Sequence, residues 1–382
     1  MNTRKTGAAP HVLHVYSGLG PAGEVRRLPD IVRGFGSRLR HSVVLAEDGA
    51  DIGPRDFGKG IDLDLSPAFP SLEGRPLPGR LARIARAMQP YDLVLSYNYG
   101  ALDAAMAATL FKDAFGLPPL IHFEDDLGDE SFDRLRRSRT WYRRIALGKT
   151  AGLVVPLERL EEIALIDWQQ PLGRVKHIPF PIDTKLQAMK TKPDALRLIK
   201  RPGERWIGAV ADFDRTDSLP ALVRAFAAIA DPAWQLVILG EGAARQAIEA
   251  EADRLQINDR VHLPGPGRDP DRAIGLFDIF AQTSDEIPVP LALTKAMAAG
   301  MPVAAMRTPG IAKTLAPDND ELLGAPGNED ELAAMLCKLA ADKALRERLG
   351  DANRRQAIEQ FDPERITSTL ARLFASAMRR EI

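Results

Sequence analysis

Cysteine is almost absent from this sequence of 382 residues, and Cys337 is the only one. One cysteine excludes an intramolecular disulfide, so the cysteine usage gives no sign of an oxidising compartment. The sequence also lacks a run of about 20 apolar residues, which a membrane-spanning helix needs. Its first residues lack the apolar core of a signal peptide. We therefore expect a cytoplasmic protein that meets a membrane, if at all, peripherally at its inner face.

An excess of charge of one sign is absent as well. The sequence has 51 Lys and Arg against 52 Asp and Glu, which gives a net charge of −1. Bulk attraction to nucleic acid is therefore not expected, and any cationic site must be local. The six histidines follow no metal-ligand spacing. We expect no metal and no cofactor beyond a substrate.

Strand and helix patterns alternate through both halves of the sequence, which predicts doubly wound parallel sheets. The fold class that we expect is α/β, with two Rossmann-like domains whose parallel sheets face a central cleft. The expected strands are 11–16, 42–46, 93–97, 120–123, 153–156, 175–179, 206–211, 235–239, 261–263 and 303–305, with a further short strand from Ile279.

The two halves define the expected domains. Residues 1–183 would form an N-terminal domain, and residues 205–361 a C-terminal domain. Between them, residues 184–204 lose periodicity and become rich in Lys, which is typical of a linker. Residues 362–382 would form a terminal helix that packs back on the N-terminal domain.

Residues 279–306 contain the most informative pattern in the sequence. A short apolar strand is followed by a loop with Ser284, Asp285 and Glu286, and then by a helix that Gly300 closes. A strand, a polar loop and a helix N-terminus in this order lie at the carboxyl edge of a parallel sheet. Such edges bind ligands, especially phosphorylated ones.

A glycine-rich turn follows the first expected strand. Gly18, Gly20 and Gly23 form G-x-G-x-x-G, and Glu47 ends the next strand. The pattern has three interpretations: a turn that faces a phosphate, the fingerprint of a dinucleotide-dependent oxidoreductase that uses NAD, or a plain tight turn.

A basic and aromatic segment, residues 131–148, is predicted to be helical and follows His122 and the acidic residues 124–126. It carries six arginines together with Trp141 and Tyr142. Such a helix could rest on anionic lipid. Alternatively, it is a solvated helix whose arginines pair with the acidic loop.

The sequence resembles family 4 (group 1) retaining glycosyltransferases of the two-domain GT-B fold. Five strings carry the resemblance in the order that the family shows: HIPFPIDT at 177–184, VILGEG at 237–242, RVHLPG at 260–265, FDIFAQTS at 277–284 and KAMAAGMPVA at 295–304. The resemblance implies transfer of a sugar from a nucleotide-diphosphate donor to a hydroxyl of a glycan or lipid-linked acceptor.

The resemblance also implies that residues 1–183 bind the acceptor and that residues 205–361 bind the nucleotide sugar. It further implies roles for individual positions. His122, Glu124 and Glu286 would be catalytic and meet the reacting sugar. The donor would be bound by Gly20, Gly23, Asp212, Asp217, Gly240, Gly242, Ser284, Lys295 and Gly310.

Four positions depart from the family pattern. Asp212 and Asp217 stand where an Arg and a Lys hold the diphosphate, and Ile287 and Lys295 stand where the family has two glutamates. Two carboxylates facing a diphosphate would repel it by some kcal/mol even at an effective dielectric constant of ~20. Lys295, Arg215 or Arg307 could restore the positive charge. The alternative is a catalytically silent homologue that binds a partner protein or a glycan.

Overall fold

The computed structural model describes most of the chain. The described residues are 9–16, 27–45, 54–65, 67–127, 130, 132, 134–185, 195–211, 213, 218–267, 270–283 and 291–382. The chain divides into two compact units. The first comprises Met1–Pro181 together with Pro363–Ile382, and the second comprises Ile182–Asp362.

The first unit contains a parallel sheet of seven described strands in the order β3-β2-β1-β4-β5-β6-β7. The strands are β1 His11–Tyr16, β2 Arg40–Leu45, β3 Leu63–Asp64, β4 Leu93–Tyr97, β5 Leu120–Phe123, β6 Gly152–Val155 and β7 Val175–His177. Strands β4, β5 and β6 are buried along their whole length, as expected for a parallel sheet covered on both faces.

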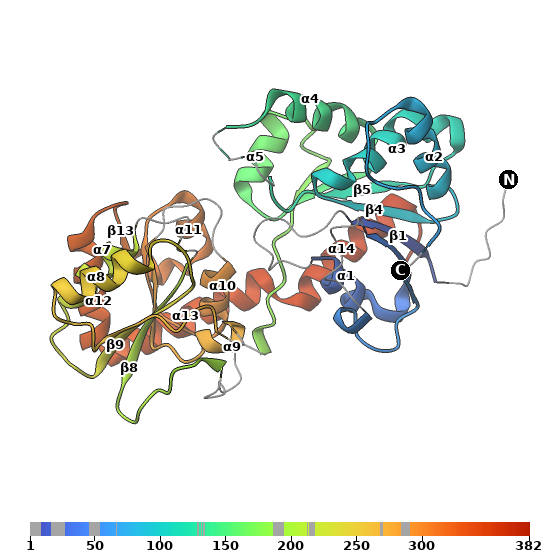
Figure 1. Ribbon diagram of the computed structural model, residues 1–382. Helices are drawn as coiled ribbons and strands as arrows, with labels where there is room; N and C mark the ends of the chain where they lie inside the picture. The colour runs from blue at the N-terminus through green and yellow to red at the C-terminus, as the bar shows by residue number, and fades with distance from the viewer. Residues whose placement is uncertain are drawn as a thin grey trace. The chain divides into compact units, whose positions relative to one another are not determined.

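Helices cover both faces of this sheet (Figure 1). One face packs against α2 Pro78–Met88, α3 Leu102–Phe115, α4 Arg137–Ala146 and α5 Glu158–Ile166. The other face packs against α1 Arg27–Phe35 and the C-terminal helix α14 Pro363–Met378. The rings of Phe35 and Phe374 stack there with centroids 5.1 Å apart, so the end of the chain completes the core of the first unit.

The second unit contains a parallel sheet of six described strands in the order β10-β9-β8-β11-β12-β13. The strands are β8 Arg205–Val210, β9 Trp234–Leu239, β10 Val261–His262, β11 Ile279–Gln282, β12 Val303–Met306 and β13 Leu323–Gly324. Its helices are α7 Leu219–Ala227, α8 Arg245–Arg254, α9 Pro270–Ile274, α10 Leu291–Ala298, α11 Pro309–Thr314, α12 Glu329–Ala341 and α13 Lys343–Phe361.

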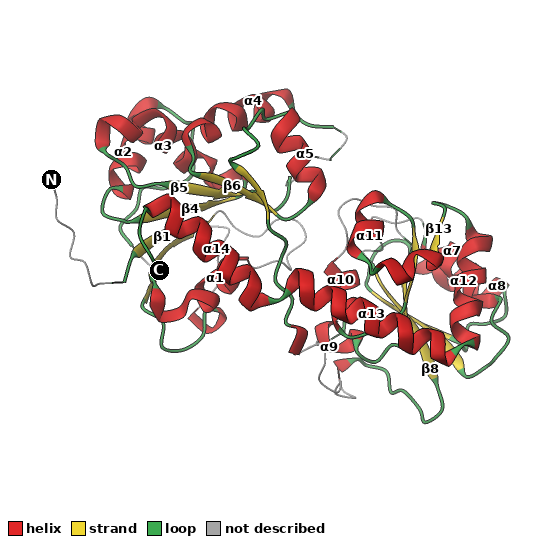
Figure 2. Ribbon diagram, turned by 180° about the vertical axis from the view of Figure 1, so that it is seen from behind, coloured by secondary structure: helices red, strands yellow, loops and turns green. Residues whose placement is uncertain are grey.

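The second sheet is also covered on both faces, as Figure 2 shows with strands in yellow between helices in red. Apolar side chains of α7, α8 and α12 form one core, and those of α9 and α10 contribute to the other. The two sheets are thus both of the Rossmann type that the alternation of patterns predicts.

Two expected segments differ from the structure. Residues 195–204 do not behave as a free linker, because Ala195 and Leu196 are buried in the core of the second unit. The basic helix α4 begins at Arg137 rather than at residue 131. No helix in the described part of the chain is both long and apolar enough to cross a membrane.

Candidate active site

Half of the residues predicted for the site can be placed in the structure. Gly20, Gly23, Asp212, Asp217, Ser284 and Glu286 lie outside the described residues. The placed residues lie in two groups, one in each unit: His122 and Glu124 in the first, and Gly240, Gly242, Lys295 and Gly310 in the second.

His122 and Glu124 bind each other at the carboxyl end of β5. The His122 imidazole lies between the hydroxyl of Ser96, at 2.8 Å from Nδ1, and the Glu124 carboxylate, at 2.8 Å from Nε2. Both side chains are fully buried. Burial alone would raise the pKa of Glu124, but the charge of Arg143 and the hydrogen bond from His122 lower it below its ordinary value.

Arg143 of α4 joins this pair to a second buried carboxylate. Its Nε and Nη2 donate to Glu124 Oε1 at 3.0 and 2.7 Å, and its Nη1 donates to Glu130 Oε2 at 2.7 Å. The guanidinium carbon also lies 4.9 Å from the ring centroids of Tyr99 and Trp168. A buried cation between two buried carboxylates fixes α4 against the end of the sheet.

The next residues at this edge, Asn98 and Asp125, are partly exposed. The Asn98 Oδ1 accepts a hydrogen bond from the Asp125 backbone N–H at 2.9 Å, and the Arg27 Nε donates to Asp125 Oδ1 at 2.7 Å. Burial raises the pKa of the Asp125 carboxyl, and the charge of Arg27 offsets this only in part. The two neighbouring carboxyls of Glu124 and Asp125 thus have pKa values displaced in opposite directions.

The backbone of Asn98 has φ 58° and ψ 177°, a region that residues with a side chain rarely adopt. The other described non-glycine residues with positive φ, Gln169, Gln256 and Arg379, all lie just beyond helix ends, where such a φ is common. Asn98 instead follows a strand. Backbone strain at the carboxyl edge of a sheet is typical of a functional site.

These contacts bear on two predictions from the sequence: the pairing of the arginines of α4, and the contact of His122 and Glu124 with a sugar. Arg143 pairs with Glu124, as the interpretation of a helix paired with the acidic loop 124–126 predicts, whereas Arg139 pairs with Glu130 outside that loop. His122 and Glu124, expected to meet the reacting sugar, have no exposed surface in the structure. Their contact with a sugar stays a prediction, and it requires Glu124 to release a buried partner.

In the second unit, Gly240 and Gly242 follow β9 with φ values of 149° and 142°. A Cβ on Gly240 would lie 2.0 Å from the carbonyl oxygen of Ala211, which follows β8. Only glycine therefore allows these two chain segments to approach each other. This requirement explains the glycine of the VILGEG string in terms of packing at the carboxyl edge.

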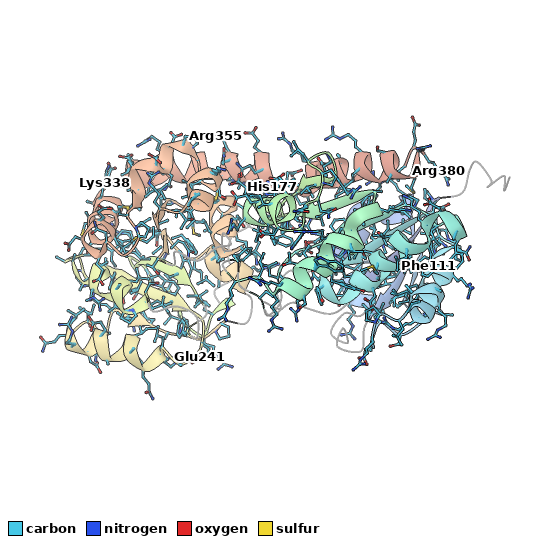
Figure 3. All side chains as sticks on the ribbon, turned by 90° about the horizontal axis from the view of Figure 1, so that it is seen from above. Phe111, His177, Glu241, Lys338, Arg355 and Arg380 are labelled. Carbon is cyan, nitrogen blue, oxygen red and sulfur yellow. The ribbon has the colours of Figure 1, made fainter. Side chains whose placement is uncertain are left out.

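A surface pocket of about 320 Å³ opens at this edge, beyond the ends of β9 and β10. Figure 3 labels Glu241, one of its lining residues, at the periphery of the second unit. The lining residues are Arg197, Glu241, Arg245, Leu263, Pro264, Gly265, Pro266 and Gly267. Pockets that bind small molecules have volumes of roughly 300–1,000 Å³, so a nucleoside is of suitable size.

Two arginines of this pocket were not predicted from the sequence. Arg245 donates to both carboxylate oxygens of Glu241, at 2.6 and 2.8 Å, and its position four residues after Glu241 could have indicated this pair. Arg197 lies in the segment expected to be a linker, where the richness in basic residues was the only available signal.

Lys295 and Gly310 lie on other parts of the second unit and do not line the pocket. Lys295 is in α10, and Gly310 is in the first turn of α11, where the Thr308 side chain accepts a hydrogen bond from the Ile311 N–H at 3.2 Å. Arg307, considered as a replacement cation, pairs with Asp320 at 2.8 Å. Arg215 lies outside the described residues.

Comparison with known proteins shows that part of the chain is similar to a family. Residues 197–356, which include the whole pocket, match the family described as Glycosyl transferases group 1. The chain is 25% identical to the lipopolysaccharide core biosynthesis glycosyltransferase LpsD of Rhizobium meliloti (strain 1021), over 77% of this chain and 78% of that protein. It is 24% identical to the 2-deoxystreptamine glucosyltransferase of Streptomyces kanamyceticus, over 68% and 70% of the two chains.

Solved structures agree with these matches. Alr3699/HepE of Anabaena, crystallised in complex with UDP, superposes with a TM-score of 0.75 and 19% identity, over 95% of this chain and 99% of that chain. WaaG, a glycosyltransferase involved in lipopolysaccharide biosynthesis, superposes with a TM-score of 0.59 and 16% identity, over 95% and 99%. These matches favour a glycosyltransferase over an oxidoreductase. Residues 197–356 are thus similar to the group 1 glycosyl transferases, and the chain has the GT-B fold of these solved structures.

Proposed function

We propose that this chain is a retaining glycosyltransferase of family 4 character. It transfers a sugar from a nucleotide-diphosphate donor to a hydroxyl of a glycan or lipid-linked acceptor, with no cofactor beyond the donor. The observation that carries the proposal is the pocket beyond β9 and β10, which lies within the region matched by the family. HepE in complex with UDP and with UDP-glucose, and LpsD in lipopolysaccharide core biosynthesis, support the donor and acceptor classes.

The chemistry requires the enzyme to stabilise a leaving diphosphate. As the bond between the anomeric carbon and the diphosphate oxygen breaks, negative charge grows on that oxygen, and fixed N–H donors or cations lower the barrier. The glycine segment 240–242 and the loop 263–267 bring backbone groups close to the pocket. In the proposed reaction they bind the nucleotide, and the acceptor hydroxyl replaces the diphosphate on the same face of the sugar.

In the first unit, the buried set of His122, Glu124 and Arg143 would act as a positioning device. Each member is satisfied by the others, and together they hold the chain segment that carries Asp125 at the sheet edge. Asp125 and Asn98 would then bind acceptor hydroxyls, because both are partly exposed and carry oxygen or amide groups.

A catalytically silent homologue remains the second candidate, favoured by the acidic residues Asp212 and Asp217 at the cation positions of the family. Turnover separates the two. The full chain is incubated with a panel of nucleotide sugars and hydroxyl acceptors, and nucleoside diphosphate release is measured. Release with one donor, with the anomeric configuration retained by NMR, supports the enzyme. Binding of a nucleotide sugar without release in any combination supports the silent homologue.

We also propose that α4 rests on an anionic membrane surface when the acceptor is lipid-linked. Trp141 is 64% exposed, and Arg134, Arg136 and Arg137 are exposed near it in the sequence. An exposed indole with arginines nearby suits the interface of an anionic bilayer, where each basic residue contributes about 1 kcal/mol. The arginines on the inner side of α4 are excluded from this role because they are paired with acidic residues.

A further inference from the structure

The pocket beyond β9 and β10 contains two arginines in different electrostatic situations. Arg245 is engaged on every side: Glu241 takes two of its hydrogen bonds, the Leu263 carbonyl oxygen a third at 3.2 Å and Glu249 a fourth at 3.3 Å. Arg197 is exposed and has no hydrogen-bond or ion-pair partner among the described residues. The positive charge that this pocket can offer a ligand therefore comes from Arg197.

The segment that carries Arg197 is anchored on both sides. Ala195 and Leu196 before it are buried in the core of the second unit. After it, the Lys200 Nζ donates to the Leu276 carbonyl oxygen at 2.8 Å and to Asp278 Oδ2 at 2.6 Å. An arginine between two anchors loses less conformational freedom on binding than one on a free linker.

Gly267 allows this segment to lie against the pocket wall. Its φ is +80°, and a Cβ there would lie 3.0 Å from Leu196 Cδ2 and 3.3 Å from the Ala195 carbonyl oxygen. A residue with a side chain would thus push away the segment just before Arg197. The glycine of the loop and the arginine of the preceding segment form one structural arrangement.

We propose that Arg197 supplies the positive charge that binds the diphosphate of the donor, in place of the two cations that the sequence lacks at Asp212 and Asp217. This proposal rests on the proposed function, because it assumes that the pocket binds a nucleotide-diphosphate donor. A guanidinium suits this task because its planar array of N–H groups can bind phosphate oxygens in pairs. Its place in the segment before β8 also explains why alignment at positions 212 and 217 does not find it.

The test is calorimetric titration of the full chain with UDP, ADP, GDP and dTDP, followed by the matching monophosphate of the nucleotide that binds. Arg197→Ala should weaken diphosphate binding about tenfold, the value of one charge-assisted hydrogen bond. Its effect on the monophosphate should be smaller. Arg197→Lys keeps the charge but loses the paired N–H groups, so it should weaken diphosphate binding by less than Arg197→Ala does. The matched control is Arg201→Ala, because Arg201 lies in the same stretch, is 83% exposed and does not line the pocket.

The outcomes separate this inference from the proposed function. Wild-type protein that binds a diphosphate, with Arg197→Ala binding it equally well, would overturn the role of Arg197 and leave the donor site intact. An equal loss for the monophosphate and the diphosphate would also overturn it, because Arg197 would then recognise the nucleoside. Wild-type protein that binds none of the four diphosphates would overturn both.

Discussion

Among the described residues, only the guanidinium of Arg143 contacts both Glu124 and Glu130. All three side chains are fully buried. Removing this cation leaves Glu124 with the hydrogen bond of His122, and Glu130 with the longer ion pair to Arg139 at 3.6 Å. Arg143→Met should therefore lower the free energy of unfolding of the first unit by about 3–5 kcal/mol. Chemical denaturation followed by circular dichroism measures the change.

The control for this change is Arg137→Met on the same helix, where the arginine is exposed. Its effect should stay within about 0.5 kcal/mol of zero. Equal stability of the two variants would contradict the structure's account of the buried network.

His14 and His41 form a second buried polar set, on β1 and β2. His14 Nε2 lies 3.0 Å from His41 Nδ1, and His14 Nδ1 lies 2.9 Å from the Tyr97 hydroxyl. Burial lowers the pKa of both imidazoles, that of His41 from 6.5 to about 4. Below pH 6.5 the unfolded chain therefore binds protons that the folded chain does not, and stability falls with pH down to about 4.

His41 alone should contribute about 3 kcal/mol to this loss, since one pKa unit corresponds to about 1.4 kcal/mol. His41→Gln should flatten the dependence of the unfolding free energy on pH between 6.5 and 4. The control is Val43→Ala, at a buried side chain of β2 that does not titrate, which should lower stability equally across this pH range and leave the slope as it is. A slope that His41→Gln does not change would refute the assignment.

At the scale of single residues, the sequence predicted where His122 and Glu124 lie on the sheet but not that their side chains are buried. The order of His122 and the acidic residues after a strand placed them at the carboxyl edge of the sheet. The burial of Glu124 depends on Arg143, which lies 19 residues later and on another element. Long-range pairs of this kind leave no local pattern in a single sequence.

At the scale of elements, α13 closely approaches the residues that follow α10, and both segments have a glycine at the point of contact. Gly350 is in α13, and a Cβ there would lie 2.1 Å from the carbonyl oxygen of Gly300, just beyond α10. Gly350→Ala should destabilise the second unit by about 1–3 kcal/mol or more, because backbone would have to move. Thermal unfolding of the full chain measures it.

The matched control is Gly79→Ala in α2, where a Cβ would meet nothing within 4 Å. The same substitution should leave stability unchanged or raise it by up to about 1 kcal/mol. If the two alanine variants had the same unfolding temperature, the close contact between α10 and α13 would be refuted.

The bounds of elements with a strong hydrophobic pattern could be predicted from the sequence. The bounds of elements that depend on long-range contacts could not. The strands β1, β4 and β5 have the predicted bounds, because buried parallel strands are continuous apolar runs. The start of α4 was predicted six residues too early, since its arginines favour a helix but give no N-terminal signal. Residues 184–204 were predicted to be a linker. The two buried residues in the described part of this segment, Ala195 and Leu196, are too few to show a period.

At the scale of the whole molecule, the proposed membrane contact of α4 gives a testable consequence. Sedimentation with vesicles rich in phosphatidylserine should carry the wild type down at low salt and release it at high salt. Trp141→Ala should reduce the bound fraction several-fold, since it removes the exposed indole. Phe111→Ala on α3, a partly buried aromatic, is the control and should bind as the wild type does. Equal sedimentation with neutral vesicles would contradict the proposal.

The two-unit architecture and the similarity to group 1 glycosyl transferases could be predicted from the sequence, because several strings in order specify more than any single motif. The candidate donor pocket itself could not be predicted from the sequence. Gly240 and Gly242 flank its lining residue Glu241, and their contact with a donor stays a prediction. Arg197 joins the pocket because the segment before β8 packs against the loop 263–267. A cation that enters a site from a different segment cannot be found by aligning the motif that it replaces.

The central claim is that the second unit binds a nucleoside diphosphate. Calorimetric titration of the full chain with nucleoside diphosphates tests it most directly, with folding checked by circular dichroism in the same sample. The account predicts saturable binding of at least one nucleotide with a Kd on the order of micromolar, about 8 kcal/mol of binding free energy. Folded protein that gives no binding heat with UDP, ADP, GDP or dTDP, at any temperature tested, would contradict it.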